Sequence, residues 1–283
     1  MSPRVDVTLW WSGLKTAVVS LLSGEMSLVA AGCAFYATLA LFPAITTLIS
    51  LYGLAFNPIT VEPQLLYLKH LMPPAAFQLI AGRIQQLVSG GKTSLGIGLA
   101  ISLVFTLYST ASGTKALIYA LNVIHKREES RGIIRFQLVT LGMTLVAIIG
   151  AVIAIGVLVG LPLLFTFFGL GKESAILAIV IGFLLMMAFM AVALGLLYRY
   201  GPAFRRDLGH TVIPGVAVAI LLWLILSYGF AVYVGQFAAY SHTYGPLATI
   251  IGLMMWFYLT AYTLLLGALF NASLDRLIVA RTP

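Results

Sequence analysis

Six long apolar runs, each long enough to cross a lipid bilayer as a helix, constrain this chain more than any other feature of its sequence. They cover approximately residues 27–56, 95–124, 136–168, 174–198, 211–240 and 245–269. The hydrocarbon core of a bilayer is about 30 Å thick, and about 20 residues of α-helix span it. The runs therefore predict an all-α, polytopic membrane helical bundle with six transmembrane helices. The third run exceeds one crossing, so its helix must tilt, break or extend beyond the bilayer.

Composition excludes a soluble fold and a disordered chain. Apolar residues make up 61% of the 283 residues and charged residues only 8%. Soluble domains average about 45–50% and about 25%, because their surface needs charge in contact with water. The single cysteine, Cys33, excludes an internal disulfide and a cysteine-based metal site.

Two further segments are too short or too polar to span. Residues 5–22 carry Trp10 and Trp11 beside Lys15, with an apolar helical face, which predicts an amphipathic helix lying on the membrane surface. Residues 57–91 contain four prolines with two short helical patterns between them. A plain loop is one interpretation of this second segment. We favour short helices that cover the outer face of the bundle.

The distribution of basic residues predicts the orientation. Eleven lie on the side of the runs that includes both chain ends, against four on the other side, with Lys115 inside a run. Because cytoplasmic loops carry an excess of Lys and Arg, both termini are expected in the cytoplasm. The expected organisation is a cytoplasmic amphipathic N-terminal helix (1–26), a transmembrane domain (27–272) with an outer-face helical loop (57–94), and a cytoplasmic tail (273–283).

Lys115 is the one charge placed well inside a run. Tyr108, Ser112, Lys115 and Tyr119 follow at i, i+4, i+7 and i+11, so they share one helix face. A charge in hydrocarbon is costly, which favours a water-accessible groove where the ammonium meets an anionic headgroup or substrate. The alternative is a lysine that snorkels toward the cytoplasmic end, about three turns away.

Polar stripes on other runs complete a candidate binding set. Tyr233 and Gln236 share a face of the fifth run, and Asn271 continues a stripe of threonine and glycine in the sixth. Hydroxyls and small residues also join membrane helices by packing alone, so a shared polar cavity and simple packing both remain open. The candidate substrate-binding residues are Lys115, Tyr108, Ser112, Tyr119, Tyr36, Tyr233, Gln236 and Asn271.

Pro43 lies in the middle of the first run. A proline has no N–H, so the carbonyl one turn earlier loses its helical partner. The residue predicts a kink, and a hinge that permits movement is the sharper hypothesis.

No catalytic or metal-binding pattern occurs in the sequence. There is no metalloprotease, Walker or nucleophile-elbow motif, and every carboxylate lies in a loop or at a helix end. Glu128 and Glu129 stand beside basic residues, which predicts a solvated loop whose charges pair with one another. The four histidines are scattered without ligand spacing: His70, His125, His210 and His242. We therefore expect no enzyme, no metal and no other cofactor.

Several short motifs follow one another along nearly all of the chain. They are Ala30-Ala31-Gly32-Cys33-Ala34-Phe35-Tyr36, Leu41-Phe42-Pro43, Ala120-Leu121-Asn122, Tyr198-Arg199-Tyr200-Gly201-Pro202, Pro214-Gly215, Tyr244-Gly245-Pro246-Leu247, Trp256-Phe257-Tyr258-Leu259 and Leu266-Gly267-Ala268-Leu269-Phe270-Asn271-Ala272. Taken together and in this order, they resemble the YihY/BrkB family of bacterial inner-membrane proteins. One position departs from the resemblance: the family often has Glu where this chain has Leu269, so Lys115 needs another partner, such as a lipid phosphate.

The resemblance implies several functions. The family once carried the label ribonuclease BN, which this chain does not fit because it lacks a metal-ligand cluster able to activate water. Some members are linked to virulence or serum resistance, and one branch to export of lipid A precursors. We therefore expect a multi-pass inner-membrane transporter or flippase of a lipid or other amphiphilic anion. The alternative is a non-transporting scaffold or envelope assembly factor. Expected partners are membrane lipids and a second copy of the chain, but no nucleic acid.

Overall fold

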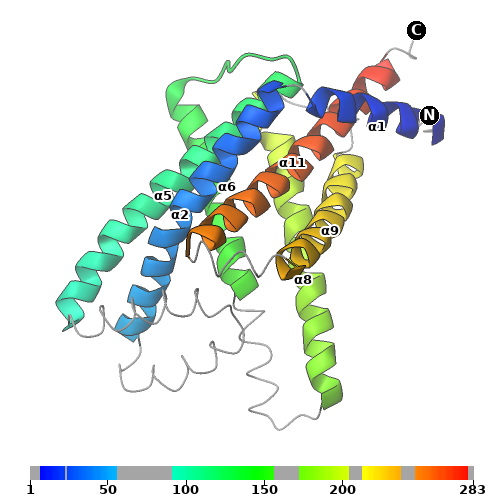
Figure 1. Ribbon diagram of the computed structural model, residues 1–283. Helices are drawn as coiled ribbons and strands as arrows, with labels where there is room; N and C mark the ends of the chain where they lie inside the picture. The colour runs from blue at the N-terminus through cyan, green and yellow to red at the C-terminus, as the bar shows by residue number, and fades with distance from the viewer. Residues whose placement is uncertain are drawn as a thin grey trace. The chain divides into compact units, whose positions relative to one another are not determined.

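The computed structural model describes residues 7–22, 24–55, 91–155, 172–203, 212–236 and 246–279, and within these ranges all regular structure is helical (Figure 1). This confirms the predicted all-α class. The helices are α1 (Val7–Leu21), α2 (Gly24–Ala55), α5 (Gly91–Ile124), α6 (Ile133–Ile155), α8 (Lys172–Tyr200), α9 (Ile213–Gln236) and α11 (Pro246–Val279).

Six of these helices contain a stretch long and apolar enough to cross a membrane, which confirms the predicted number of spans among the described residues. Most boundaries agree with the prediction to within a few residues. The exception is α11, which continues to Val279, beyond the predicted end at residue 269. Residues 270–274 are buried, so packing keeps this less apolar stretch helical. Residues 57–90 of the predicted outer-face loop and the end of the third run lie outside the described residues, whereas residues 91–94 of that loop belong to helix α5.

Helix α2 runs through Pro43 without ending. The hydroxyl of Thr47 donates to the carbonyl of Pro43 over 2.9 Å, and that of Thr46 donates to the carbonyl of Phe42 over 3.1 Å. These two carbonyls lie at and directly before Pro43, so the threonine bonds do not replace the N–H partner that the proline removes from the carbonyl one turn earlier. A hinge at Pro43 stays a prediction.

The chain divides into two compact units. Unit 1 comprises Met1–Ala31, Thr114–Ser227 and Leu259–Pro283, and unit 2 comprises Gly32–Gly113 and Tyr228–Tyr258. The boundaries cut through α2, α5, α9 and α11, so each of these helices contributes one part to each unit. Unit 1 also holds α1, α6 and α8.

Helices α8, α9 and α11 of unit 1 meet in a close contact. The hydroxyl of Tyr198 on α8 donates to the carbonyl of Leu264 on α11 over 2.6 Å. A Cβ added to Gly267 would collide with the Gly215 carbonyl of α9, and would lie 2.6 Å from the Tyr198 hydroxyl and 2.8 Å from the Ala219 Cβ. Only glycine allows this approach of the two backbones, as in other small-residue contacts between membrane helices.

Helix α5 ends in a Schellman motif with an unusual residue at its turn. The Arg127 N–H donates to the carbonyl of Asn122, the Lys126 N–H donates to the carbonyl of Val123, both over 2.9 Å, and Lys126 has a φ of 52°. This left-handed position is usually glycine, because a Cβ there is strained. The motif turns the chain toward α6, and the lysine at this position adds backbone strain that a glycine would avoid.

We expect Lys126→Gly to raise the free energy of unfolding by about 0.5–1 kcal/mol, because glycine adopts a positive φ without strain. Thermal unfolding of the detergent-purified protein measures the gain. Lys126→Ala serves as the control, since it removes the same exposed side chain but keeps the Cβ. Equal melting temperatures for the two variants would contradict the explanation.

Candidate functional site

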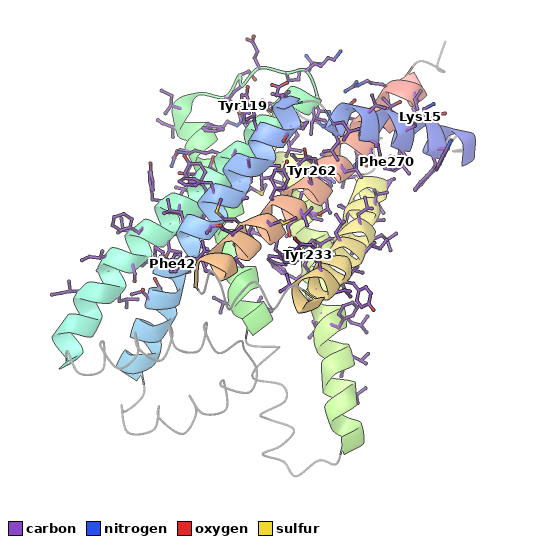
Figure 2. All side chains as sticks on the ribbon, in the orientation of Figure 1. Lys15, Phe42, Tyr119, Tyr233, Tyr262 and Phe270 are labelled. Atoms are coloured by element: carbon purple, nitrogen blue, oxygen red, sulfur yellow. The ribbon has the colours of Figure 1, made fainter. Side chains whose placement is uncertain are left out.

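The residues predicted around Lys115 form an exposed face of α5, which we call the lysine face: Tyr108, Ser112, Lys115 and Tyr119. Tyr108 is 66% exposed and Tyr119, labelled in Figure 2, is 57% exposed, while Ser112 and Lys115 are half-buried. The same side of α5 is apolar nearer its N-terminus, where the large exposed side chains are Ile97, Ile101, Val104 and Phe105. The surface of one span thus changes from apolar to polar at Tyr108.

The polar groups of the lysine face have few protein partners. The Ser112 hydroxyl donates to the Tyr108 carbonyl of its own helix over 2.9 Å, which leaves its lone pairs free to accept. Within the described residues no acidic side chain forms an ion pair with Lys115. An ammonium in this position can bind an anion that approaches α5 from the side.

The other predicted binding residues lie on different helices. Tyr36 of α2 is half-buried, with its ring edge-on to Phe35 at 5.4 Å. Tyr233 of α9 is exposed and stacks on Phe230 at 6.2 Å (Figure 2). Gln236 ends α9, and its side chain lies outside the described residues. The predicted set is divided between the two units, and a cavity shared by the whole set stays a prediction: unit 2 contains Tyr36, Tyr108, Ser112 and Tyr233, and unit 1 contains Lys115, Tyr119 and Asn271.

The structure shows a clear role for Asn271, which lies buried on α11. Its side-chain oxygen accepts from the Gly215 N–H over 2.8 Å, and its side-chain nitrogen donates to the Val212 carbonyl over 3.1 Å. These are groups of the first turn of α9, where backbone N–H groups lack helical partners. Asn271 therefore caps α9 from a neighbouring helix, and contact with a substrate remains a separate prediction.

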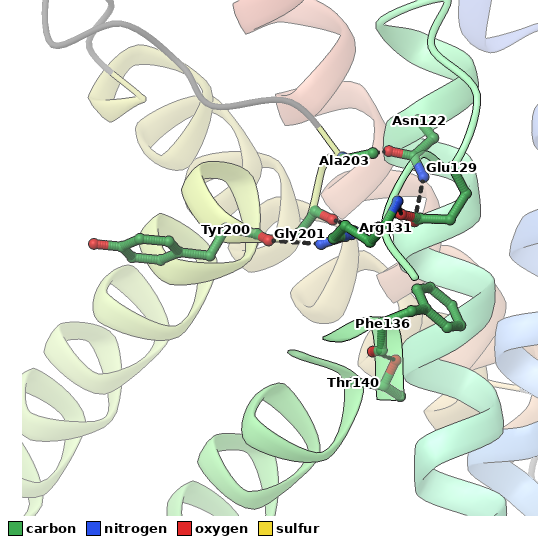
Figure 3. Close-up of polar contacts among 8 residues, drawn as sticks. All are labelled: Asn122, Glu129, Arg131, Phe136, Thr140, Tyr200, Gly201 and Ala203. Carbon is green, nitrogen blue, oxygen red and sulfur yellow. Dashed lines mark hydrogen bonds and ion pairs between the residues drawn. The ribbon is translucent and has the colours of Figure 1, made fainter. Parts of the chain in front are cut away.

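A polar network joins the α5–α6 loop to the end of α8 (Figure 3). The guanidinium of Arg131 pairs with Glu129 at 2.6 Å, and donates to the carbonyls of Tyr200 at 3.3 Å and Gly201 at 2.8 Å. Asn122 donates to Glu129 over 2.9 Å and accepts from the Ala203 N–H over 2.7 Å. A cation at the C-terminal end of α8 also offsets the negative end of its helix dipole.

This network was not predicted in full. The charges of the loop pair with one another and residues 126–130 are exposed, as the sequence suggested, whereas the Arg131 side chain is only 6% exposed. The hydrogen bonds of Arg131 lower the pKa of Glu129, with smaller contributions from Asn122. Arg276 plays a related part on α11, where it donates to the Ile124 carbonyl at the end of α5 over 2.8 Å.

A second polar face of α5, buried in unit 2, was missed altogether. It is made of Ser102, Thr106 and Ser109, at i, i+4 and i+7. Thr47 of α2 donates to Ser102 over 2.9 Å, whereas the Ser109 hydroxyl has no hydrogen-bond partner among the described residues. The spacing was visible in the sequence, but small hydroxyls occur on every side of this helix, so only the structure separates the buried face from the exposed one.

The described residues contain no group of three His, Cys, Asp or Glu side chains that could hold a metal ion.

The chain is similar in sequence to a family of bacterial proteins and to several of its members. A model of the family described as virulence factor BrkB matches residues 17–283. The ribonuclease-like protein YfkH of Bacillus subtilis (strain 168) is 28% identical over 263 residues, which are 86% of this chain and 88% of that protein. A UPF0761 membrane protein of Xanthomonas oryzae pv. oryzae (strain PXO99A) is 36% identical over 88 residues, which are 31% of this chain and 20% of that protein. No solved structure matches.

Proposed function

The chain belongs to the virulence factor BrkB family, and from this premise we propose that it moves or flips a lipid or other amphiphilic anion in the bacterial inner membrane. In this proposal Lys115 attracts the acidic headgroup while the apolar part of the molecule stays in the bilayer. Both termini face the cytoplasm, as the excess of basic residues on that side suggests. The proposal involves no catalytic step.

The observation that carries the proposal is the unpaired ammonium on an exposed face within a span. A lysine at the centre of a membrane helix costs about 2.5–3.5 kcal/mol on insertion scales, and within the described residues no carboxylate pairs with Lys115 to offset that cost. Lys115 lies nine residues before the end of α5 at Ile124, about 13 Å along the axis. A headgroup phosphate drawn to it would have moved well below the membrane surface.

The exposed side of α5 has a polar part, the lysine face, that suits a lipid headgroup and an apolar part that suits acyl chains. The tyrosine hydroxyls of Tyr108 and Tyr119 lie on either side of Lys115 along the helix and can donate to phosphate oxygens. The apolar stretch from Ile97 to Phe105 continues the face, and it suits acyl chains. A substrate whose headgroup binds at Lys115 can therefore keep its tails against α5 rather than in water.

The proposal is tested by headgroup translocation in proteoliposomes, with fluorescent phospholipids of several headgroups and a membrane-impermeant quencher. We expect the native chain to speed quenching above empty liposomes, and Lys115→Ala to slow it by about tenfold, the effect of losing one charge-assisted hydrogen bond. Lys126→Ala, which removes an exposed lysine from the loop, is the matched control and should behave like the native chain.

The other outcomes distinguish the alternatives. Activity that Lys115→Ala leaves intact would keep transport but remove Lys115 as the anchor of the headgroup. Folded protein with no activity above empty liposomes, for every lipid tried, would favour a scaffold or assembly factor in which Lys115 only snorkels to the surface.

A further inference from the structure

Helix α1 is held close to the start of the first candidate span by a short connection. Two residues separate the end of α1 at Leu21 from the start of α2 at Gly24, where the first candidate span begins. A link this short reaches about 10 Å when fully extended. The end of α1 therefore lies close to the level where the first span leaves the bilayer.

One side of α1 packs against α11. The ring of Trp10 lies 5.4 Å from the ring of Phe270, and a Cβ added to Gly13 would lie 3.2 Å from Leu274. Ala17, one turn further along, is fully buried. Figure 2 labels Phe270 of α11 and Lys15, which α1 carries on another side. Contacts at Phe270 and Leu274 hold α1 beside the end of a second candidate span.

A second side of α1 is exposed and contains large apolar residues with one charge. Trp11, Lys15, Val18 and Leu22 follow at i, i+4, i+7 and i+11, so they form one stripe. Trp11 is 71% exposed and Leu22 is 76% exposed. Lys15 is exposed, and within the described residues no acidic side chain pairs with it. We call this set the α1 outer stripe.

A third side of α1 carries small polar residues. Ser12 and Thr16 are exposed, and the Thr16 hydroxyl donates to the Ser12 carbonyl over 2.9 Å. At 100° per residue they lie about a third of a turn from the outer stripe. The helix therefore has a packed side, an apolar side and a polar side, as expected of a helix that lies in the plane of the headgroups between protein, lipid and water.

From this arrangement we infer that the α1 outer stripe docks on anionic phospholipid at the surface of the bilayer. The indole of Trp11 has the amphipathic character that concentrates tryptophan at membrane interfaces. The aliphatic stem of Lys15 can lie along the acyl region while its ammonium reaches a phosphate. Positive charge without an acidic partner favours an anionic headgroup over a zwitterionic one. The inference does not depend on Lys115 or on transport.

The experiment uses the full-length protein in nanodiscs, with tryptophan fluorescence quenched by phospholipids brominated near the headgroup end of the acyl chains. Subtracting the signal of Trp11→Phe from that of the native chain isolates Trp11. Trp10→Phe is the matched control, because Trp10 packs on one side against Phe270 and is 40% exposed, against 71% for Trp11. We expect at least twofold stronger quenching of Trp11 than of Trp10.

Lys15 determines the headgroup preference in the same assay. At equal mole fraction, brominated phosphatidylglycerol should quench Trp11 as though it were about fivefold enriched over brominated phosphatidylcholine, the effect expected of one basic residue near the surface. In Lys15→Gln the two lipids should quench equally. Equal quenching in the native chain would overturn the anionic preference.

Two further results would overturn the docking itself. Quenching of Trp11 by aqueous iodide but not by brominated lipid would place the stripe in water. Protection of Trp11 from both quenchers would mean that protein, such as a second copy of the chain, covers the stripe instead of lipid.

Discussion

Replacing Gly267 by alanine should lower the free energy of unfolding by about 3 kcal/mol or more, the largest loss of stability that we predict. The new Cβ would collide with the Gly215 carbonyl and lie 2.6 Å from the Tyr198 hydroxyl. Overpacking a core by a few methylenes costs about 1–3 kcal/mol when side chains can adjust, and here a backbone atom must move. We expect a melting temperature lower by about 5–10 °C in detergent.

Gly252→Ala on the same helix is the matched control. No atom lies within 4 Å of the position that its Cβ would occupy, and alanine is a better helix former than glycine. This variant should be as stable as the native chain or slightly more so. If both substitutions changed the melting temperature equally, the close approach of α9 and α11 would not be the cause.

The second large effect is expected from Arg131→Ala. The substitution leaves Glu129 with Asn122 as its remaining side-chain partner and leaves the carbonyls of Tyr200 and Gly201 without the guanidinium. Removing one partner of a fully buried ion pair costs about 3–5 kcal/mol. This pair is only partly buried, because the Glu129 side chain is 29% exposed, so we expect a loss of about 2 kcal/mol, the range of hydrogen bonds to charged groups. Thermal unfolding in detergent measures the loss.

Two comparisons separate this network from general effects of charge. Arg131→Lys keeps the charge but cannot reach the carboxylate and both carbonyls at once, so its stability should be intermediate. Arg135→Ala removes an exposed arginine four residues along the chain and should leave the melting temperature unchanged. A loss for Arg135→Ala as large as for Arg131→Ala would contradict the assignment.

The same network predicts a pH dependence with a definite sign. The pKa of Glu129 is lower in the folded protein, chiefly through its hydrogen bonds with Arg131. The carboxylate therefore stabilises the fold above its unfolded pKa of about 4.3, and this contribution is lost as the pH falls through the folded value. As the pH falls from about 4.3 through the lower folded pKa, the melting temperatures of the native chain and of Glu129→Gln should therefore converge. Parallel curves would rule out Glu129 as the titrating group.

The spans were predictable because their signal is local. Each of the six runs is apolar over some twenty residues, and no distant partner is needed for such a helix to form in a bilayer. The shared face of Tyr108, Ser112, Lys115 and Tyr119 was also predictable, since helical periodicity alone sets it. The exposure of this face could not be predicted, because it depends on which side of α5 the other helices cover.

The polar contacts could not be predicted from the sequence either, because they join residues that only the tertiary structure brings together. Arg131 and Gly201 are 70 residues apart in the chain, and Asn271 and Gly215 are 56 apart. Nothing near either residue in sequence marks its partner. Asn271 shows the consequence most clearly: its position in a polar stripe suggested contact with a substrate, which stays a prediction, and only the structure shows that its amide caps the first turn of α9.

The sequence by itself determined the membrane class, the number of helices and the residues that share each face, because hydropathy and helical periodicity act between neighbours along the chain. The tertiary structure decided which face of α5 is buried, which polar groups cap helix ends and where α9 and α11 approach through Gly215 and Gly267. These features depend on packing between residues distant in sequence. In a bilayer that packing relies on shape and hydrogen bonding rather than on hydrophobicity, so the apolar pattern that marks the helices does not specify how they meet.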